Sequence, residues 1–404
     1  MGDFRATARW IFPVSGPPVE HGVLSVVAGR VESVRDRNAV TPDIDFGHCA
    51  IVPGLVNVHT HLDLSGARGR TPPGPDFTDW LQRVIEFRST RDAPDIANDI
   101  RLGLAESRQY GTTLIGDISA HGESAAICSA AAMRATVFRE LIGLALPRSR
   151  QAIRDAMPWL TSAATPDLVR VGLSPHAPYS FNVHTLESIS HCTVELGTHR
   201  TFPLAIHLAE SAAERELLEM HTGPFVPFLN RLGAWEPTGL ARSPEQIVDL
   251  TQMAQSVIYV HCNNLRPVPM TPRASIAYCP RTHAAFGHPP HPFREFLARG
   301  VRVALGTDSL ASNPDLSVLA EARFLAARHP DLNRPTLLRM ATLNGAEALG
   351  WAKETGSLDP GKSADFVVIP LPDRDAADPH ELLFDSDRAV QSVWFRGEKV
   401  EPVA

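Results

Sequence analysis

Lysine is almost absent from this chain of 404 residues. The basic charge comes nearly entirely from arginine, because the only lysines are Lys353, Lys362 and Lys399, all close to the C-terminus. Chemistry placed between residues 50 and 350 must therefore proceed without a lysine Schiff base. A carboxylated lysine that bridges two metal ions is excluded there for the same reason.

Cysteine is scarce as well, and its five positions form no recognisable pattern. Cys49, Cys128, Cys192, Cys262 and Cys279 are odd in number, widely spaced and free of any Cys-x-x-Cys pair. We therefore expect reduced thiols and a cytoplasmic location, with neither a disulfide framework nor a zinc–thiolate site.

Long apolar runs are missing too. None approaches the ~18–20 residues that span a bilayer, and the N-terminal stretch MGDFRATARWIFP has no apolar core of the kind that a secretory signal needs. The net charge of −7 argues against a nucleic-acid-binding surface. With 44% hydrophobic and 21% charged residues, the composition is that of a soluble globular protein, and we expect its partner to be a small-molecule substrate.

Short apolar runs alternate with helical spacing through the middle of the chain. Eight runs rich in β-branched residues lie at 50–58, 111–118, 135–143, 168–174, 202–209, 256–262, 274–280 and 301–308. Stretches at helical spacing occur between and after them, at 78–89, 93–111 (with Gly111 as a stop signal) and 334–350. Eight such units predict an α/β fold built on a TIM-like (β/α)8 barrel.

Both ends of the chain have the character of short strands. The stretch GVLSVVAGRVESV alternates around a predicted hairpin turn at Gly29-Arg30, and GSLDPGKSADFVVIPLP near the C-terminus is similar. We expect residues 1–52 and 358–404 to meet in one small β-sandwich domain, and residues 53–357 to form the metal-binding catalytic barrel.

Polar residues follow the predicted strands at their carboxyl ends, where the catalytic groups of such barrels gather. His59 and His61 are separated by one residue, so on a strand both side chains point to the same side. Further polar residues occupy the corresponding places on later runs, namely His176, His207, Glu210, His261 and Asp308. Each alone fits a satisfied core histidine or a helix cap equally well, but their joint placement favours a functional site.

The types of these polar residues are those of a metal-binding hydrolytic site. Three imidazoles with a carboxylate, from His59, His61, His207 and Asp308, form a ligand set for a divalent metal ion, zinc above all, with iron or nickel as alternatives. Glu210 follows a ligand histidine by three residues and can act on the water as a general base and then as an acid. His261 is left to orient the water or the developing alkoxide.

These residues lie in segments that resemble the amidohydrolase superfamily. The segments are PGLVNVHTHLD, LSPHAPYS, HLAES, YVHCNNL, LGTDSLASNP and GSLDPGKSADFVVI. Within it, the chain resembles the mononuclear aminohydrolase branch, which holds the cytosine, guanine and S-adenosylhomocysteine deaminases and the related triazine chlorohydrolases. The resemblance implies a single metal ion, hydrolytic deamination of an adenine-type nucleoside or a related aminated heterocycle, and release of ammonia.

The resemblance also implies a role for each residue. The metal ligands are His59, His61, His207 and Asp308, Glu210 shuttles protons, and His261 orients the water. Asp308 accepts the second proton, and His176 contacts the substrate. Relatives often complete their pocket from a neighbouring subunit, so a homodimer is consistent with the resemblance.

Substrate contacts are expected in the loops after the first, third, fourth and seventh runs, which hold Trp80, Arg139, Glu140, Arg148, His176, Arg281 and His283. The segments VFRELIGL, HLAES and CPRTHAAFGH resemble a bacterial subgroup that includes the aminofutalosine deaminases, whose substrate carries a benzoate. Arg148 or Arg281 can pair with such a carboxylate through two hydrogen bonds. Alternatively, both are surface residues of a chain that uses arginine in place of lysine.

Other interpretations stay open at this point. The same site can serve a hydrolase of another C–N or C–Cl bond, such as an amide, a lactam or a chlorotriazine. A catalytically inactive barrel that acts as a scaffold is disfavoured, because every ligand histidine is present. His288 and His291 in GHPPHP mark either a second metal site or, more simply, a proline-stiffened loop.

Overall fold

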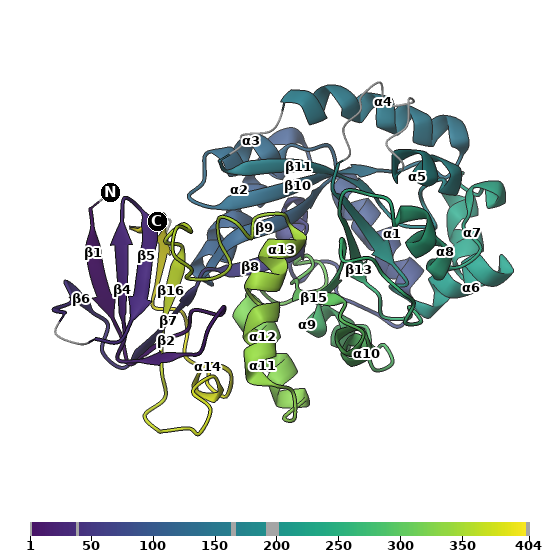
Figure 1. Ribbon diagram of the computed structural model, residues 1–404. Coiled ribbons are helices and arrows are strands. Elements are labelled where there is room, and N and C mark those ends of the chain that lie inside the picture. Colours follow the sequence, from purple (N-terminus) through teal and green to yellow (C-terminus); the bar gives the residue numbers. More distant parts are fainter. Residues whose placement is uncertain (1, 38–39, 163–166, 191–201, 401–404) are drawn as a thin grey trace.

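The computed structural model describes residues 2–37, 40–162, 167–190 and 202–400. Its largest sheet holds eight parallel strands in chain order (Figure 1). They are β8 (Leu55–Thr60), β9 (Thr112–Ser119), β10 (Arg134–Leu141), β11 (Val169–Pro175), β12 (Leu204–Leu208), β13 (Val257–His261), β14 (Ala274–Tyr278) and β15 (Arg302–Leu305). Each overlaps one of the eight predicted runs, and the TIM-like barrel is confirmed.

The barrel closes where the first strand meets the last. The backbone N–H groups of Thr307 and Asp308 both donate to the carbonyl of His59, at 3.1 Å each. The Asn57 amide donates to Oγ1 of Thr307 at 2.7 Å, and its Oδ1 accepts from the Thr307 N–H at 3.1 Å. This seam places His59, from the first strand, directly beside Asp308, which follows the last.

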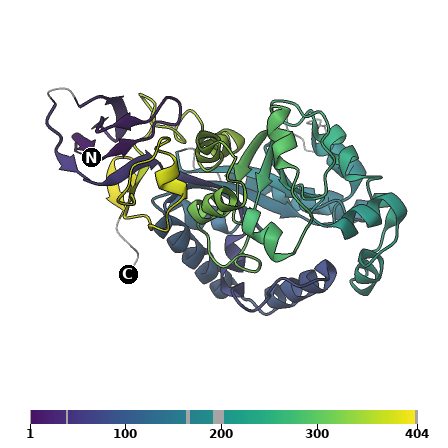
Figure 2. The same cartoon turned by 90° about the horizontal axis from the view of Figure 1, so that it is seen from below.

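Helices surround the barrel and connect most of its strands (Figures 1 and 2). They are α1 (Phe77–Ser89), α2 (Ala93–Gln109), α3 (Ser124–Ser129), α4 (Leu146–Ser162), α5 (Val183–Ser190), α6 (Ala212–Met220), α7 (Phe225–Arg231), α8 (Pro244–Thr251), α9 (Pro280–Ala285), α10 (Phe293–Ala298), α11 (Val318–Arg328), α12 (Arg334–Met340) and α13 (Leu343–Ala348), with short 3-10 turns η1 (Leu62–Ala67) and η3 (Pro237–Gly239). The predicted helices at 78–89 and 93–111 correspond to α1 and α2, and Gly111 follows α2 with a φ of 93°.

Two helical details differ from the sequence expectation. The stretch 334–350 forms two helices, α12 and α13, because the chain breaks at Thr342, whose hydroxyl donates to the carbonyl of Leu338 at 2.6 Å. No helix joins β13 to β14: residues 262–273, all of them described, form a loop. The three prolines in its sequence RPVPMTP remove backbone donors and disfavour a helix there.

Two smaller sheets are built from the ends of the chain. One holds, in order, β5 (Arg30–Arg35), β4 (Val23–Val27), β1 (Phe4–Thr7) and β6 (Ile44–Asp45). The other holds β18 (Glu398–Val400), β17 (Ser392–Phe395), β16 (Phe366–Pro370), β7 (Cys49–Pro53), β2 (Trp10–Ile11) and β3 (Val19–Glu20). A short helix, α14 (Glu381–Phe384), lies in the connection from β16 to β17.

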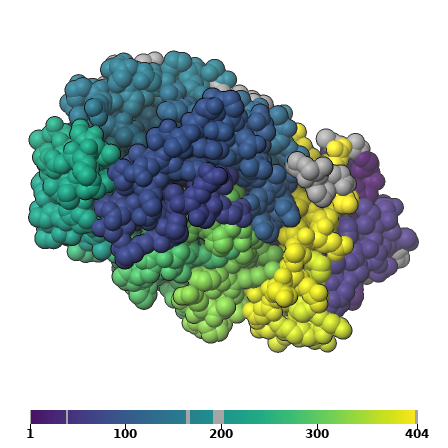
Figure 3. Space-filling model, turned by 180° about the vertical axis from the view of Figure 1, so that it is seen from behind, coloured from purple at the N-terminus to yellow at the C-terminus, as the bar shows by residue number. Residues whose placement is uncertain are grey.

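The C-terminal segment is joined to the N-terminal one, because β16 pairs antiparallel with β7. Figure 3 shows the yellow C-terminal residues between the purple N-terminal strands and the barrel. The expectation that both ends form one β-rich unit is confirmed, whereas the exact boundaries at 52/53 and 357/358 stay a prediction. The hairpin turn falls on Ala28 and Gly29, one residue earlier than predicted, because a two-residue turn needs positive φ at both positions, here 48° and 73°.

The interior of the barrel is filled by side chains. Trp351 is 1% exposed and packs with Val56, Phe138 and Leu349 in the inner core. Its indole N–H donates to Oγ1 of Thr136 at 3.0 Å. Open space for a ligand is therefore left at the carboxyl end of the strands.

The described part of the chain contains no helix that is both long and apolar enough to cross a bilayer. Its four cysteines are buried free thiols, and Cys192 lies outside the described residues.

Candidate functional site

The side chains of His59, His61, His207 and Asp308 lie close together at the carboxyl end of the barrel, although up to about 250 residues separate them in the sequence. Nε2 of His61 lies 3.2 Å from Nε2 of His207, and Oδ1 of Asp308 lies 3.5 Å from Nε2 of His59 and 3.8 Å from Nε2 of His61. One ligand atom from each of the three histidines falls within 4.8 Å of the others, and the same holds for His59, His261 and Asp308. The structure thus brings together all four residues predicted as metal ligands.

The donor atoms of this cluster fit a cation. Both ring nitrogens of His59, Nδ1 of His61 and Nε2 of His261 are buried and have no hydrogen-bond partner among the described residues. Buried polar atoms are normally paired, so the unpartnered Nε2 of His59, 3.5 Å from Oδ1 of Asp308, suits a metal ion. Burial also lowers the pKa of His61 and His207 well below the ordinary value, which keeps these imidazoles neutral.

Neighbouring groups orient the predicted ligands. Nδ1 of His207 donates to the carbonyl of His176 at 3.1 Å, which turns Nε2 toward the cluster. The Ser312 hydroxyl donates to Oδ2 of Asp308 at 2.7 Å. Burial raises the pKa of Asp308, but His59, His261 and Ser312 outweigh it and the pKa is lowered overall, so this carboxylate is ionised.

Several residues of the site, or next to it, have a left-handed backbone conformation, which sets the direction of the neighbouring side chains. Positive φ occurs at Ala209 (50°), His261 (68°), Cys262 (59°) and Asp308 (57°), none of which is glycine. Such conformations cost roughly 1–3 kcal/mol each and cluster at functional sites. Here they lie at the ends of β12, β13 and β15, where the predicted catalytic residues leave their strands.

Glu210 and His261 form a pair beside the cluster. Oε1 of Glu210 lies 3.3 Å from Nε2 of His261. Burial, together with the charges of Asp308 and Glu214, raises the pKa of Glu210 well above its ordinary value. A carboxyl group whose pKa is raised in this way takes up a proton more readily than an exposed one and can pass it on.

Glu214 holds the backbone that carries Glu210. Its carboxylate accepts from the N–H groups of Ala209 at 2.8 Å and Glu210 at 3.0 Å, while the Ser211 hydroxyl accepts from the Glu214 N–H at 3.2 Å. This resembles a capping box at the start of α6, except that the Glu214 carboxylate reaches past the N-cap residue Ser211 to the N–H groups of the two residues before it. Ser211 and Glu214 stand three residues apart in the sequence, so a capping-box pattern was available there to predict it.

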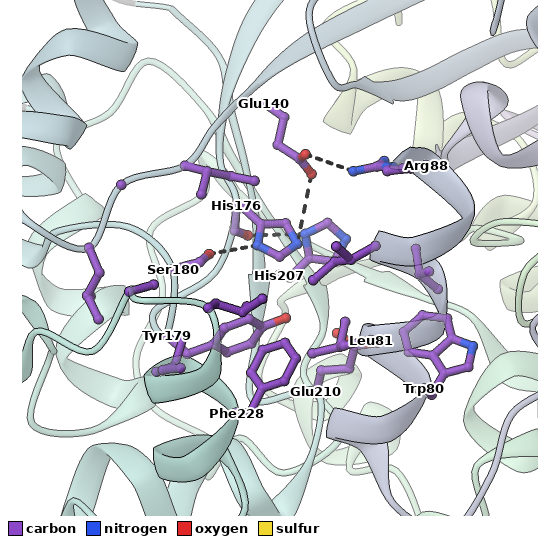
Figure 4. Close-up of a pocket in the computed structure, with 18 of the residues that line it drawn as sticks. Trp80, Leu81, Arg88, Glu140, His176, Tyr179, Ser180, His207, Glu210 and Phe228 are labelled. Atoms are coloured by element: carbon purple, nitrogen blue, oxygen red, sulfur yellow. Dashed lines mark hydrogen bonds and ion pairs between the residues drawn. The ribbon is translucent and has the colours of Figure 1, made fainter. Parts of the chain in front are cut away.

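A cavity of about 500 Å³ opens beside these residues (Figure 4). Its polar end is formed by His61, His176, His207, Glu210, His261 and Asp308. Most of the remaining wall is apolar and includes Trp80, Leu81, Val84, Leu144, Tyr179, Phe228, Leu229 and Trp235. A cavity of this size with one polar end is typical of a site for a small organic ligand.

The predicted substrate contacts divide into two groups. Trp80, Glu140, Arg148 and His176 line the cavity, whereas Arg139 and His283 do not. Arg281 does not: its guanidinium group lies 2.7 Å from Asp315 and 2.7 Å from the fully buried Glu321. These two carboxylates hold it outside the cavity, so the structure does not bring Arg281 to the site.

The loop that holds His288 and His291 belongs to neither cluster capable of holding a metal ion in the described residues. Nε2 of His291 donates to the carbonyl of His261 at 2.7 Å, and the His291 ring stacks on Tyr278 with centroids 3.9 Å apart. Its role is therefore to support the strand end at His261.

Arg88 belongs to the cavity wall and was not singled out from the sequence. Arg88, at the end of α1, lies between Glu140 and Asp63, with N···O distances of 3.1 and 3.2 Å. Nothing local distinguishes it from the many other arginines, because helix α1 reaches the cavity only through tertiary packing.

The family model of the amidohydrolase family matches residues 50–400, which include all eight barrel strands. The chain belongs to the amidohydrolase family. This membership, together with the buried histidine cluster, supports a divalent metal ion in the site.

Individual relatives cover nearly the whole chain. A family member from Moorella thermoacetica, a 5-methylthioadenosine/S-adenosylhomocysteine deaminase, is 30% identical over 423 residues, covering 100% of this chain and 92% of the relative. Among solved structures, the Helicobacter pylori aminofutalosine deaminase in complex with methylthio-coformycin has a TM-score of 0.83 at 21% identity, covering 98% of this chain and 100% of that one. A zinc-bound adenosine deaminase from Xanthomonas campestris has a TM-score of 0.78 at 24% identity, covering 98% and 92%. At these identities the two structures support the shared fold.

Proposed function

We propose that this protein is a zinc-dependent hydrolase that removes the amino group from an adenine-type nucleoside and releases ammonia. The observation that carries the proposal is the position of the Glu210–His261 pair directly beside the cluster of His59, His61, His207 and Asp308, at the polar end of an otherwise apolar cavity. The deaminase activity named for the Moorella relative supports the choice of reaction.

In this proposal, His59, His61, His207 and Asp308 hold the zinc ion. When bound, the ion would supply Lewis acidity and lower the pKa of a water molecule toward neutrality. The set offers three imidazoles and one carboxylate, which suits zinc, and iron or nickel are the alternatives.

The side chains of the chain itself handle the protons. Glu210 takes a proton from the attacking water and delivers it to the leaving nitrogen, so that one C–N bond breaks as one C–O bond forms. His261, 3.3 Å from Glu210, hydrogen-bonds the oxygen that attacks. Asp308 accepts the second proton of the water, and this proton ends on the ring nitrogen beside the reacting carbon, which leaves a ring C(=O)–NH group and free ammonia as products.

The cavity wall suits the rest of a nucleoside. Trp80 and Phe228 offer aromatic surface to a purine, and Arg148 stands at the exposed side of the cavity. We propose that Arg148, and not Arg281, meets an anionic group on the 5′ side of the sugar, such as the carboxylate of aminofutalosine. A homodimer stays a prediction.

The test is a substrate panel with zinc-loaded protein. Adenosine, 5′-methylthioadenosine, S-adenosylhomocysteine and aminofutalosine are each followed by ammonia release and by the change in purine absorbance, with Glu210→Gln as the background control. Turnover of at least one of them is expected. Zinc-loaded protein that is inactive on all four but dechlorinates a chlorotriazine, or cleaves a lactam, would instead establish the alternative hydrolase.

A further inference from the structure

A second cavity, of about 300 Å³, lies at the end of the barrel opposite to the histidine cluster. Its wall includes Arg134, the first residue of β10, and Arg170, the second residue of β11. These positions lie at the amino ends of the strands, whereas the histidine cluster lies at their carboxyl ends. The packed barrel core around Trp351 separates the two cavities, so a ligand in the second cavity does not occupy the proposed active site.

The terminal strands supply the other side of this cavity. Arg30 begins β5 directly after its hairpin turn, and Arg396 stands in the turn between β17 and β18 with a φ of 53°. The N–H of Arg396 donates to Oδ1 of Asp365 at 2.9 Å, which fixes that turn against the segment before β16. The cavity therefore lies where the barrel meets the unit formed by the two chain ends, and Figure 1 shows that unit on the left of the barrel.

The charges in the wall of this cavity are mostly positive. Four guanidinium groups and two carboxylates line it, namely those of Arg30, Arg134, Arg170, Arg396, Asp167 and Glu354. A third carboxylate, that of Asp365, pairs closely with Arg134. Even with this one included, the positive charges outnumber the negative ones, and we refer to the site as the arginine cavity.

Two of the four arginines have no acidic partner. Arg30 lies 3.7 Å from a carboxylate oxygen of Glu354, and Arg134 is paired as described above. Arg170 and Arg396, in contrast, form no ion pair with any carboxylate in the described part of the chain. Charges that are removed from water are normally paired, so these two half-buried cations are an exception that a bound anion would remove.

Neutral groups hold both unpaired guanidinium groups in place. Arg170 donates through Nη1 to the carbonyl of Gly350, and its Cζ lies over the ring of Trp351, 3.8 Å from the ring centroid. Arg396 donates through Nη2 to the carbonyl of Asp167 at 2.8 Å. These contacts orient the two guanidinium groups but do not neutralise their charge.

The remaining donors of both groups can reach a ligand. Nε and Nη2 of Arg170 and Nε and Nη1 of Arg396 have no hydrogen-bond partner within the described residues, and none of them is among the buried atoms that lack a partner. These four atoms are therefore accessible. Nε of Arg134, in contrast, is buried, so this donor is out of reach of a ligand.

The surroundings of Arg170 do not compensate its charge. Burial lowers the pKa of its guanidinium group, Glu354 offsets this effect only in part, and Arg134 lowers the pKa further. The charged form is thus less stable than in water, and an anion beside it would stabilise it.

We propose that the arginine cavity binds a small phosphate-bearing anion, either inorganic phosphate or a phosphate monoester. Nε and Nη2 form one edge of the Arg170 guanidinium group and match two oxygens of a phosphate, while Arg396 donates to a third. A phosphate group carries about −1.5 to −2 charges at pH 7, which matches two unpaired arginines better than a carboxylate does. The bound anion joins Arg170 of the barrel to Arg396 of the terminal strands and stabilises their contact. This second site does not depend on the reaction proposed above.

The test measures phosphate binding to the full-length, zinc-loaded protein. Equilibrium dialysis with radiolabelled inorganic phosphate is carried out at an ionic strength held constant with chloride. Saturable binding at one site per chain is expected, and the melting temperature should rise by roughly 2–4 °C at a hundredfold excess over Kd. Competition by glycerol 3-phosphate shows whether the free ion or a monoester binds more tightly, and either result agrees with the proposal.

Two variants locate the site. Arg170→Gln and Arg396→Gln each remove charge-assisted hydrogen bonds to the phosphate, so each is expected to raise its Kd by at least about tenfold. Arg294→Gln is the matched control, because it removes the same charge from an exposed ion pair with Asp331 outside the cavity, and its Kd should stay within about twofold of wild type. Circular-dichroism melting without phosphate checks that each variant is folded. Arg396→Gln, in a turn between strands, decides the matter where Arg170→Gln does not fold.

Three outcomes overturn the proposal. Wild-type protein that shows no saturable phosphate binding up to about 10 mM has no such site. Binding that is unchanged in both variants places the phosphate elsewhere, for example at the zinc ion. An equal loss of binding in Arg294→Gln shows a dependence on net charge alone, without a specific site.

Discussion

The buried carboxyl group of Asp117 on β9 gives this protein a specific pH dependence of stability. Its Oδ1 accepts from the N–H of Leu62, the residue after His61, at 2.8 Å, and the Ser124 hydroxyl hydrogen-bonds its other oxygen. Asp117 is 1% exposed. Burial raises its pKa to about 7, and the nearby negative charges of Asp63 and Glu123 add to the effect.

The sign follows from proton linkage. In the folded protein Asp117 holds its proton up to about pH 7, whereas in the unfolded chain it loses that proton near about pH 4. The folded state is therefore favoured at low pH, and this contribution is lost as the pH rises through the window between the two pKa values. A difference of about three pKa units corresponds to up to about 4 kcal/mol of unfolding free energy.

We predict that Asp117→Asn removes this dependence. Asparagine cannot ionise, yet its amide oxygen still accepts from the Leu62 N–H, so the fold around His61 is retained. The unfolding free energy of the variant relative to wild type should rise steadily from pH 4 to pH 8, by up to about 4 kcal/mol. Urea unfolding followed by circular dichroism at each pH, on zinc-loaded protein, measures the difference.

Asp331 provides a control of opposite sign. Hydrogen bonding to Arg294 lowers its pKa to about 2, so Asp331→Asn should lose stability relative to wild type as the pH rises from about 2 to about 4, only slightly because the pair is exposed, and the difference should stay flat from pH 4 to pH 8. A difference between Asp117→Asn and wild type that is flat from pH 4 to pH 8 would refute the reasoning about Asp117.

Three further predictions concern the site and its support. Glu210→Gln should lower kcat by roughly 10²- to 10⁴-fold with unchanged zinc content by atomic absorption, and unchanged turnover would contradict its proton-transfer role. Glu214→Ala should lower kcat by about 10- to 100-fold with a smaller change in KM, because the N–H groups of Ala209 and Glu210 lose their acceptor. Glu219→Ala, at an exposed position of the same helix, is the control, and equal kcat values for the two variants would count against this role of Glu214. Trp351→Ala should lower the unfolding free energy by about 3–5 kcal/mol in urea denaturation by opening a cavity at the closed end of the barrel, and a loss below about 1 kcal/mol would show that the core refills.

Much of the fold was accessible from the sequence because the signals are local. A buried parallel strand requires a short run of apolar, β-branched residues, and all eight runs mark real strands. Polar residues at the ends of those runs had to meet once the strands closed into a barrel, which is why His59, His207 and Asp308 were singled out. The break at Thr342 and the loop between β13 and β14 were missed because helical spacing and strand–helix alternation are averages over a segment, whereas a single hydrogen bond or a few prolines decide the outcome.

The positions of the arginine side chains could not be predicted from local sequence patterns. Arg148 and Arg281 each follow a barrel strand within a few residues, in α4 and α9, and were equivalent in the sequence. Tertiary structure separates them, because Asp315 and Glu321 lie beside Arg281 while Arg148 is left at the cavity. The same holds for Arg88, which gains its place next to Glu140 only through the packing of α1 against the barrel.

The sequence by itself therefore determined the barrel, the family and the identity of the residues at its carboxyl end, because each depends on patterns within a few residues of the chain. Only the tertiary structure decided which charged side chains face the cavity, how the backbone at Ala209, His261 and Asp308 aims them, and which guanidinium groups of the described residues are left without a carboxylate partner. Those properties depend on distances between residues that are far apart in the chain, and a distance of this kind exists only once the whole barrel has closed.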